Sequence, residues 1–327
     1  MIDIVIPSML GGANLNLLVS QLVSQGFNKN NIFIVKDGHH PFWKDVSPSL
    51  NVIQTKKRLG FAGACDFGIR NSNSDHVLLL NDDLSISEGF FDLLSKYKDF
   101  EPFVGFRILN KKGTHIEFDG GGMNVFGYGL SLSCGKKIHL KDNSETLFAC
   151  GACSLMNRKF YEKVGGFCTD FFCYFEDTEF GWRANRLGFK TFFVRDRDIS
   201  ICHAGQHTSG KESGFRERMM ERNSFLALLL NIPSSILSEY LALAWEFSKV
   251  REFESQKIGF KEIQNGCWHS RKNVARYVEK ISRLRAFSDL NQHSFKKTRH
   301  LLEDPINPAF PKMISKKLLE RVYQLWF

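Results

Sequence analysis

The sequence 171-FFCYFEDTEFGWRANRLGFK-190 places two adjacent carboxylates, Glu176 and Asp177, directly after an aromatic run. The residues that follow show the spacing of one apolar helix face: Phe180, Trp182, Ala184 and Leu187. The carboxylate pair therefore falls in the first turn of a predicted helix, where the positive helix end stabilises negative charge. A pair of acids at this place suggests a general base.

A second carboxylate pair follows the apolar run 77-VLLL-80, which reads as a buried strand. Asn81, Asp82 and Asp83 then lie at the carboxyl edge of a sheet, where open α/β folds bind ligands. Carboxylate oxygens are the ligands that magnesium and manganese prefer. Acids at strand ends and helix starts also act as caps and turn formers, so each pair alone has a structural alternative.

The first half of the chain alternates segments with strand and helix patterns. In chain order we expect a strand at 4–7, a helix at 14–25, strands at 32–35 and 52–53, a helix at 62–71, a strand at 77–80 and a helix at 90–97. This order predicts an α/β fold with a mostly parallel central sheet covered on both faces. A glycine-rich stretch at 111–145 breaks the pattern, and we expect a functional loop there.

The last third of the chain is basic and helical in pattern. Residues 211–327 carry 21 Lys and Arg against 13 Asp and Glu, and helices are expected at 225–230, 236–247 and 273–284. We therefore predict a catalytic domain at 1–230 and a basic helical subdomain at 231–327. No run approaches the roughly 20 apolar residues that span a bilayer, and the first residues read as a strand rather than a signal peptide, so a cytoplasmic location is expected.

Several motifs occur in order along the chain: 59-LGFAGACDFGIRNSNSDHVLLLNDDLSISEGFFDLL-94, 151-GACSLMNRKFYEKVGGF-167, the Glu176-Asp177 run and 201-ICHAG-205. This series resembles the family-2 inverting glycosyltransferases of the GT-A fold, over roughly residues 2–231. Rhamnosyl- and galactofuranosyltransferases of bacterial surface-glycan assembly are the most similar members. The resemblance implies a metal-dependent enzyme that uses a nucleotide-diphosphate sugar donor and a glycan or lipid-linked glycan acceptor.

Specific roles follow from this resemblance. Asp83 matches the residue that binds Mg²⁺ or Mn²⁺, with Asp82 beside it, and Asp177 matches the general base that activates the acceptor hydroxyl. Glu176 is expected to support the base or contact the acceptor. His203 is a second candidate metal ligand, and His207 a weaker one. 

Donor recognition is expected from residues near the strand ends and the first motif: Pro7, Ser8, Asp37, Arg58 and Asp66. The family has an acid one place before Asp37, where this chain has Lys36. That departure leaves the residue that contacts the nucleotide base open by one position.

Two other functions compete with glycosyl transfer. A sugar nucleotidyltransferase would share the sheet, but the sequence lacks a glycine-rich loop with a basic residue near its first strand. A non-catalytic basic module for membrane or nucleic acid would use the C-terminal charge but leave the acidic pairs unexplained. We expect no nucleic-acid partner.

The C-terminal helices suggest peripheral membrane contact. Apolar residues recur at helical spacing and form one face: Ile236, Leu237, Tyr240, Leu241, Ala244 and Trp245. A dense basic stretch follows: Arg271, Lys272, Arg276, Lys280, Arg283 and Arg285. Each basic residue near an anionic membrane surface contributes about 1 kcal/mol to the free energy of binding to that surface. The alternative is that the apolar face packs on the catalytic domain or on a second subunit of a homo-oligomer.

Overall fold

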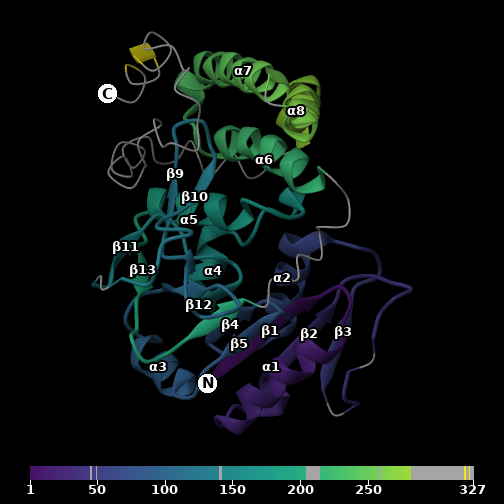
Figure 1. Cartoon of the computed structure of the whole chain (residues 1–327), viewed down its shortest axis with the longest axis vertical. Helices are drawn as coiled ribbons and strands as arrows, with labels where there is room; N and C mark the ends of the chain where they lie inside the picture. The colour runs from purple at the N-terminus through teal and green to yellow at the C-terminus, as the bar shows by residue number, and fades with distance from the viewer. Residues whose placement is uncertain are drawn as a thin grey trace.

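The computed structural model describes residues 1–44, 46–48, 50–139, 142–203, 214–257 and 259–280, together with 320, 321 and 324. Within them an α/β body lies beneath a layer of three helices (Figure 1). The central sheet has the strand order β11 (Ser144–Thr146), β13 (Thr191–Val194), β6 (Phe103–Phe106), β12 (Cys153–Asn157), β4 (His76–Leu80), β1 (Ile2–Ser8), β2 (Ile32–Lys36) and β3 (Asn51–Gln54).

Six of these eight strands run in one direction. β12 is antiparallel to both of its neighbours, β4 and β6, and β11 is antiparallel to β13, while the remaining pairs are parallel. The expected mostly parallel sheet is confirmed. The sequence predicted β1 to β4 but not β12, which brings the chain back beside β4.

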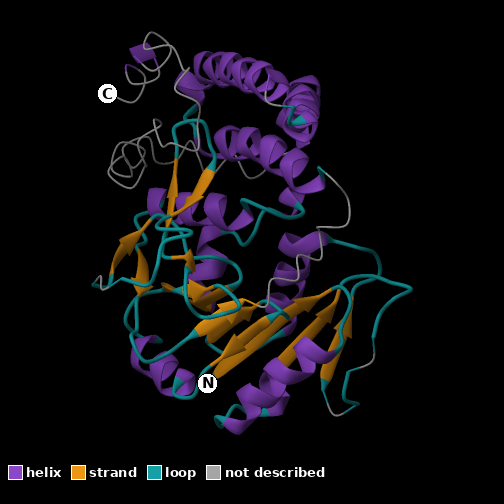
Figure 2. Ribbon diagram, in the orientation of Figure 1, coloured by secondary structure: helices purple, strands orange, loops and turns teal. Residues whose placement is uncertain are grey.

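Helices cover both faces of the sheet, as Figure 2 shows. Alternate residues of β1 enter two separate cores: Ile4 and Ile6 join the core under α1 (Ala13–Ser24) and α3 (Phe90–Tyr97), whereas Val5 joins the core under the helices of the other face. Those helices are α2 (Gly60–Asn71), α4 (Arg158–Val164) and α5 (Glu176–Arg186). The two-residue period of a strand divides its side chains in this way.

The stretch at 111–145 is not the irregular loop that the sequence suggested. It contains β8 (Ile116–Phe118), β9 (Gly121–Met123), β10 (Gly129–Ser131) and β11. β8 joins a second sheet in the order β5 (Leu84–Ile86), β14 (Ile201–His203), β7 (Ile108–Leu109) and β8, and β9 pairs with β10. Strands of three residues are too short to show an alternating pattern, which is why the expectation was wrong.

Three helices follow the body: α6 (Phe215–Asn231), α7 (Ser234–Lys257) and α8 (Lys261–Lys280). α6 lies against α5 on one side and against α7 and α8 on the other (Figure 1). The predicted division at 230/231 therefore falls at the end of a helix that both parts share. Two short 3₁₀ turns, Lys29–Asn31 and Thr169–Phe171, complete the described elements.

The apolar face of α7 packs on the body rather than facing solvent. The Tyr240 hydroxyl donates a hydrogen bond to the Val125 carbonyl, and Phe247 stacks on Phe126 with ring centroids 3.9 Å apart. Other members of the predicted face are buried or packed against the core: Ala244, Ile236, Leu237 and Leu241. The packing alternative is thus the one that the structure supports for this face.

The basic stretch is described only in part. Arg271 donates hydrogen bonds to Ser248 and Glu252 on α7, and Lys272 is exposed. Arg276 and Lys280 belong to α8, whereas Arg283, Arg285 and the end of the helix expected at 273–284 lie outside the described residues. Across the described helices, no segment is both long enough and apolar enough to cross a bilayer.

Candidate active site

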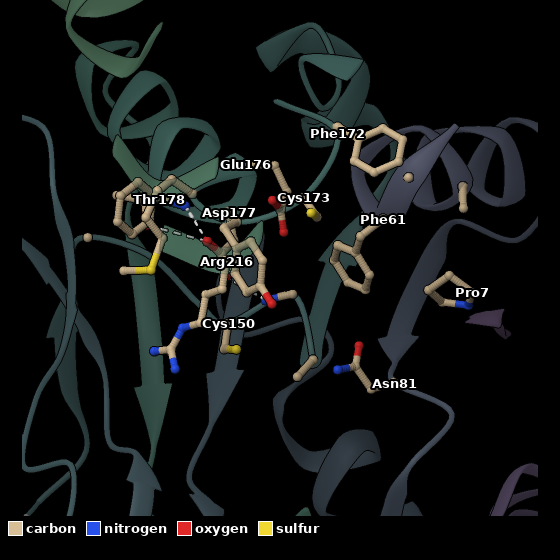
Figure 3. Close-up of a pocket in the computed structure, with 18 of the residues that line it drawn as sticks. Pro7, Phe61, Asn81, Cys150, Phe172, Cys173, Glu176, Asp177, Thr178 and Arg216 are labelled. Atoms are coloured by element: carbon tan, nitrogen blue, oxygen red, sulfur yellow. Dashed lines mark hydrogen bonds between the residues drawn. The ribbon is translucent and has the colours of Figure 1, made fainter. Parts of the chain in front are cut away.

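A cavity of about 500 Å³ opens at the carboxyl ends of β1, β2 and β4. Apart from Asp66, and from His207, which lies outside the described residues, the predicted site residues line it: Pro7, Ser8, Asp37, Arg58, Asp82, Asp83, Glu176, Asp177 and His203. Figure 3 shows Pro7 and Asn81 on one side of this space and Asp177, Cys150 and Arg216 on the other. The fold thus brings both acidic pairs to one cavity, although about 90 residues separate them in the chain.

Asp66 is the exception, and its predicted contact with the donor is not what the structure shows. Its carboxylate accepts hydrogen bonds from the Tyr161 hydroxyl at 2.9 Å and from Arg70 Nε at 2.8 Å. Arg70 belongs to α2 and Tyr161 to α4, and Asp66 is not among the residues that line the cavity. Asp66 instead links α2 to α4.

The small sheet brings the candidate metal ligands together. In the antiparallel pairing of β14 with β5, His203 lies opposite Leu84, the residue after Asp83. As a result, His203 Nε2 lies 2.9 Å from Asp83 Oδ1, and its Nδ1 lies 2.9 Å from Oε2 of Glu117 on β8. Burial alone would lower the pKa of His203, but the hydrogen bonds and charges of Asp83 and Glu117 raise it above its ordinary value.

Asp82 is held by the first strand. The Ser8 hydroxyl at the end of β1 donates a hydrogen bond of 2.5 Å to Asp82 Oδ2 and accepts one from the Gly11 amide. Burial and the neighbouring charge of Asp83 raise the pKa of Asp82 to about 6, against the lowering effect of the Ser8 bond. Ser8 thus orients Asp82 at the cavity floor.

These residues fit a divalent cation that is completed by its substrate. Within the described ranges, no cluster of three or more His, Cys, Asp and Glu side chains is gathered as a ligand set. Asp83 and His203 offer two ligands, however, and such cations often bind one or two protein groups and substrate phosphates. Asn81 Oδ1 is buried in the same wall without a hydrogen-bond partner among the described residues, and it adds an acceptor. Glu117 holds the other nitrogen of His203, as carboxylates do for metal-binding histidines.

The second acidic pair opens α5. Asp177 Oδ2 accepts from the Gly151 amide at 3.1 Å, and its Oδ1 accepts from the Thr178 amide at 2.7 Å (Figure 3). Glu176 is 5% exposed, and its Oε2 has no partner in the described part of the chain. Burial raises the pKa of Asp177, and burial together with the charge of Asp177 raises that of Glu176. Burial therefore outweighs the helix-end stabilisation expected from sequence.

A short turn connects the two pairs. The Asn81 amide donates to the Ala152 carbonyl at 2.9 Å, while the neighbouring Gly151 donates to Asp177. A Cβ on Gly151 would lie 2.8 Å from the Phe61 ring, so a larger residue there would require this ring to move. The turn fixes the position of Asp177 relative to Asn81 and the acidic pair that follows it.

Asp37 lines the cavity but is occupied by the protein. Its two oxygens accept from the amides of Leu59 at 2.7 Å and Gly60 at 2.9 Å, at the start of α2. Its first role is therefore to hold this turn, and its contact with the donor stays a prediction. The Arg58 guanidinium lies over the Phe172 ring, 5.3 Å from its centroid, at the cavity wall.

Sequence reasoning missed Glu117, Gly151 and Arg216. Arg216 belongs to the first turn of α6 and brings a positive charge to the cavity. Glu117 lies in the stretch that was expected to be irregular. No local pattern distinguishes Glu117 and Arg216, because each reaches the site only through tertiary contacts between distant segments. Gly151 opens one of the quoted motifs, but the motif does not reveal its contact with Asp177.

The mixed sheet, with a cavity and two acidic pairs at its carboxyl edge, has the architecture of the GT-A fold of glycosyltransferases. Residues 3–165 match the family model of glycosyl transferase family 2, and the chain belongs to this family through that domain. The chain is 31% identical over 178 residues to the low-salt glycan biosynthesis hexosyltransferase Agl10 of Haloferax volcanii, a match of 51% of this chain and 56% of the relative. It thus spans little more than half the length of that relative.

Solved structures support the fold. The structure of GalNAc-T7 with UDP, GalNAc and Mn²⁺ superposes with a TM-score of 0.56 at 11% identity, over 76% of this chain and 50% of that one. Residues 1–349 of Staphylococcus aureus TarS superpose with a TM-score of 0.52 at 12% identity, over 99% of this chain and 88% of that one. The family assignment favours glycosyl transfer over the nucleotidyltransferase and the non-catalytic alternatives.

Proposed function

We propose that this glycosyltransferase transfers one sugar from a nucleoside diphosphate sugar to a hydroxyl of a glycan or lipid-linked glycan, with inversion at the anomeric carbon. The observation that carries the proposal is the single cavity that holds a candidate cation pair, Asp83 and His203, and a carboxylate pair, the buried Glu176 and the half-buried Asp177. The cation pair suits the departing diphosphate, and the carboxylate pair suits the attacking hydroxyl.

Asp177 is the proposed general base. It lies at the cavity surface with one oxygen held by Gly151 and the other by Thr178, so its orientation is fixed. Its raised pKa increases its affinity for the acceptor proton, which is what a base near neutral pH requires. Removing that proton as the oxygen attacks from the face opposite the diphosphate inverts the anomeric carbon in one displacement. Glu176, buried behind it, sets the charge environment of Asp177.

The diphosphate side would be served by Asp83 and His203, which would hold Mg²⁺ or Mn²⁺. When bound, the cation would offset the negative charge that develops on the leaving diphosphate. An imidazole ligand favours Mn²⁺ over Mg²⁺, because Mg²⁺ prefers oxygen. Asp82, held by Ser8, and the Arg216 cation would orient the donor from either side.

We also propose that the enzyme acts at the cytoplasmic face of a membrane, where a lipid-linked acceptor would be met. Support comes from two exposed aromatic rings of the C-terminal helices, each with a lysine over it. Lys257 Nζ lies 4.3 Å from the centroid of the Phe253 ring, and Lys272 Nζ lies 4.8 Å from that of the Trp268 ring. Aromatic rings next to lysines suit an anionic lipid interface. Co-sedimentation with anionic and neutral vesicles tests this location, and absence of binding to anionic vesicles at low salt contradicts it.

The function itself is tested by a thermal-shift panel of UDP, dTDP and GDP, each with and without Mn²⁺ or Mg²⁺. We expect one nucleotide to raise the melting temperature only when the cation is present. The nucleotide that binds then directs a hydrolysis assay with its common sugar derivatives. No shift with any nucleotide and cation would contradict the proposed donor class.

A further inference from the structure

The backbone that leads into the carboxylate pair has an unusual conformation. Three bulky residues have positive φ angles: 63° at Phe172, 67° at Tyr174 and 66° at Phe175. Side chains with a Cβ rarely adopt this left-handed region, at a cost of about 1–2 kcal/mol each. Such a run persists only where surrounding contacts determine it, and it often marks a functional site.

Asn223 on α6 supplies those contacts. The nitrogen of its buried side-chain amide carries two hydrogens and lies within hydrogen-bond distance of three carbonyls of the loop, at 3.1 Å from Phe171, 2.8 Å from Cys173 and 2.6 Å from Tyr174. These carbonyls flank the left-handed residues. A single side chain therefore holds the loop where its conformation is most strained.

Arg222 fixes the orientation of that amide. Its Nε donates to Asn223 Oδ1 at 2.8 Å, and since an arginine only donates, the amide nitrogen must face the loop. The Nη2 of Arg222 also donates to the carbonyls of Asp170, at 2.9 Å, and Phe171. The two neighbouring residues of α6 thus act as one clamp on residues 170–174.

The opposite side of the loop is held by α2. The Ala62 amide donates to the Phe172 carbonyl at 3.0 Å. Gly60 packs so closely that a Cβ there would lie 2.4 Å from the same oxygen. Asp37, which directly follows β2, in turn holds the start of α2. The loop is therefore fixed between the carboxyl edge of the sheet and α6.

We propose that Arg222 and Asn223 are positioning residues for sugar transfer. They keep the loop in its left-handed conformation, which directs Asp177 into the cavity and keeps Glu176 away from water. The inference rests on the proposed function, since it assumes that Asp177 is the base. When the clamp is removed, the loop relaxes, the carboxylates become hydrated and the pKa of the base falls.

The test uses Asn223→Ala and Arg222→Lys in the full-length enzyme. We expect kcat to fall by about 10- to 100-fold, since a shift of about 1 Å at a reacting group has effects of this size. Affinity for the nucleoside diphosphate should stay unchanged, and the acid limb of the kcat profile should move to lower pH. Hydrogen exchange measured by mass spectrometry should rise in peptides that cover residues 170–177.

Asn231→Ala is the matched control. Asn231 is a buried asparagine on the same helix, but its amide donates to Glu179 and Ala227 rather than to the loop. Its loss should lower the melting temperature without changing the acid limb or the exchange of 170–177. If the two Asn variants lose stability alike and neither changes kcat or the acid limb, the clamp has only a structural role and the inference is wrong.

Two further outcomes separate this inference from the proposed function. Arg222→Lys, at a half-buried position, decides the question if Asn223→Ala does not fold. If Asp177→Asn keeps full turnover, the base assignment fails, while exchange of residues 170–177 still reports whether the clamp holds the loop. Raised exchange with unchanged kcat in an enzyme that needs Asp177 overturns the positioning role alone.

Discussion

The two acidic pairs of this enzyme occupy one cavity but are held in opposite ways. Asp82 and Asp83 follow an unstrained buried strand and have the Ser8 hydroxyl and the His203 ring as partners. Glu176 and Asp177 follow a left-handed loop, and the buried Oε2 of Glu176 has no partner in the described structure. Asp83 beside an imidazole can hold a cation, whereas Glu176, with a buried oxygen that has no partner in the described structure, takes up a proton more readily. Surroundings, rather than residue type, thus give the two pairs different tasks.

The largest expected effect comes from breaking the cation pair. Asp83→Ala should reduce transfer by at least about 10³-fold, because charge stabilisation by a bound metal contributes several kcal/mol. It should also abolish the Mn²⁺-dependent part of nucleoside diphosphate binding, measured by calorimetry. Glu239→Ala, at an exposed site on α7, is the control for loss of a carboxylate. Unchanged metal-dependent binding would show that the cation is held elsewhere.

Breaking the other pair should affect turnover without affecting donor binding. Asp177→Asn should lower kcat by about 10²- to 10⁴-fold, the usual range for loss of a general base. Because the pKa of Asp177 is raised, the wild-type rate should fall with decreasing pH at a higher pH than an ordinary aspartate would give, and the variant should lose this limb. If Glu176→Gln lowers turnover more than Asp177→Asn, with donor binding intact in both, Glu176 is the base.

A smaller effect tests the residue behind the cation pair. Glu117→Gln keeps a hydrogen-bond acceptor for His203 but removes the charge, and it should weaken Mn²⁺ binding by about 10- to 100-fold. His203→Ala should act in the same direction. Titration of the nucleotide at several Mn²⁺ concentrations measures the change. Equal Mn²⁺ affinity in both variants and the wild type would return His203 and Glu117 to a structural role.

Both acidic pairs could be predicted from the sequence because each adjoins a strong local pattern: an apolar strand precedes the first pair, and a helix face follows the second. Their partners could not be predicted in this way. Glu117 reaches His203 across a sheet of short strands, and Asn223 reaches the loop from a helix about 50 residues away. The positive φ angles at Phe172 and Phe175 leave no mark in residue type, since neither is a glycine. Asp66 shows the converse. It lies in a recognised motif, but the motif did not reveal that its carboxylate binds the Tyr161 hydroxyl of α4.

The smallest effect concerns stability and sharpens the contrast between the pairs. The folded state raises the pKa of Glu176, so as pH rises above about 4.3 the unfolded chain loses this proton first and stability falls through the interval up to the folded pKa. Glutamine has nearly the same shape and does not titrate. Glu176→Gln should therefore unfold like the wild type near pH 4 and be more stable by about 1–3 kcal/mol near pH 8, as expected when a buried charge without a partner is removed. Urea unfolding at both pH values measures the difference. A variant that is less stable at pH 8 would mean that the Glu176 carboxylate is stabilised in the folded enzyme, and the dehydrated environment assigned to this pair would be wrong.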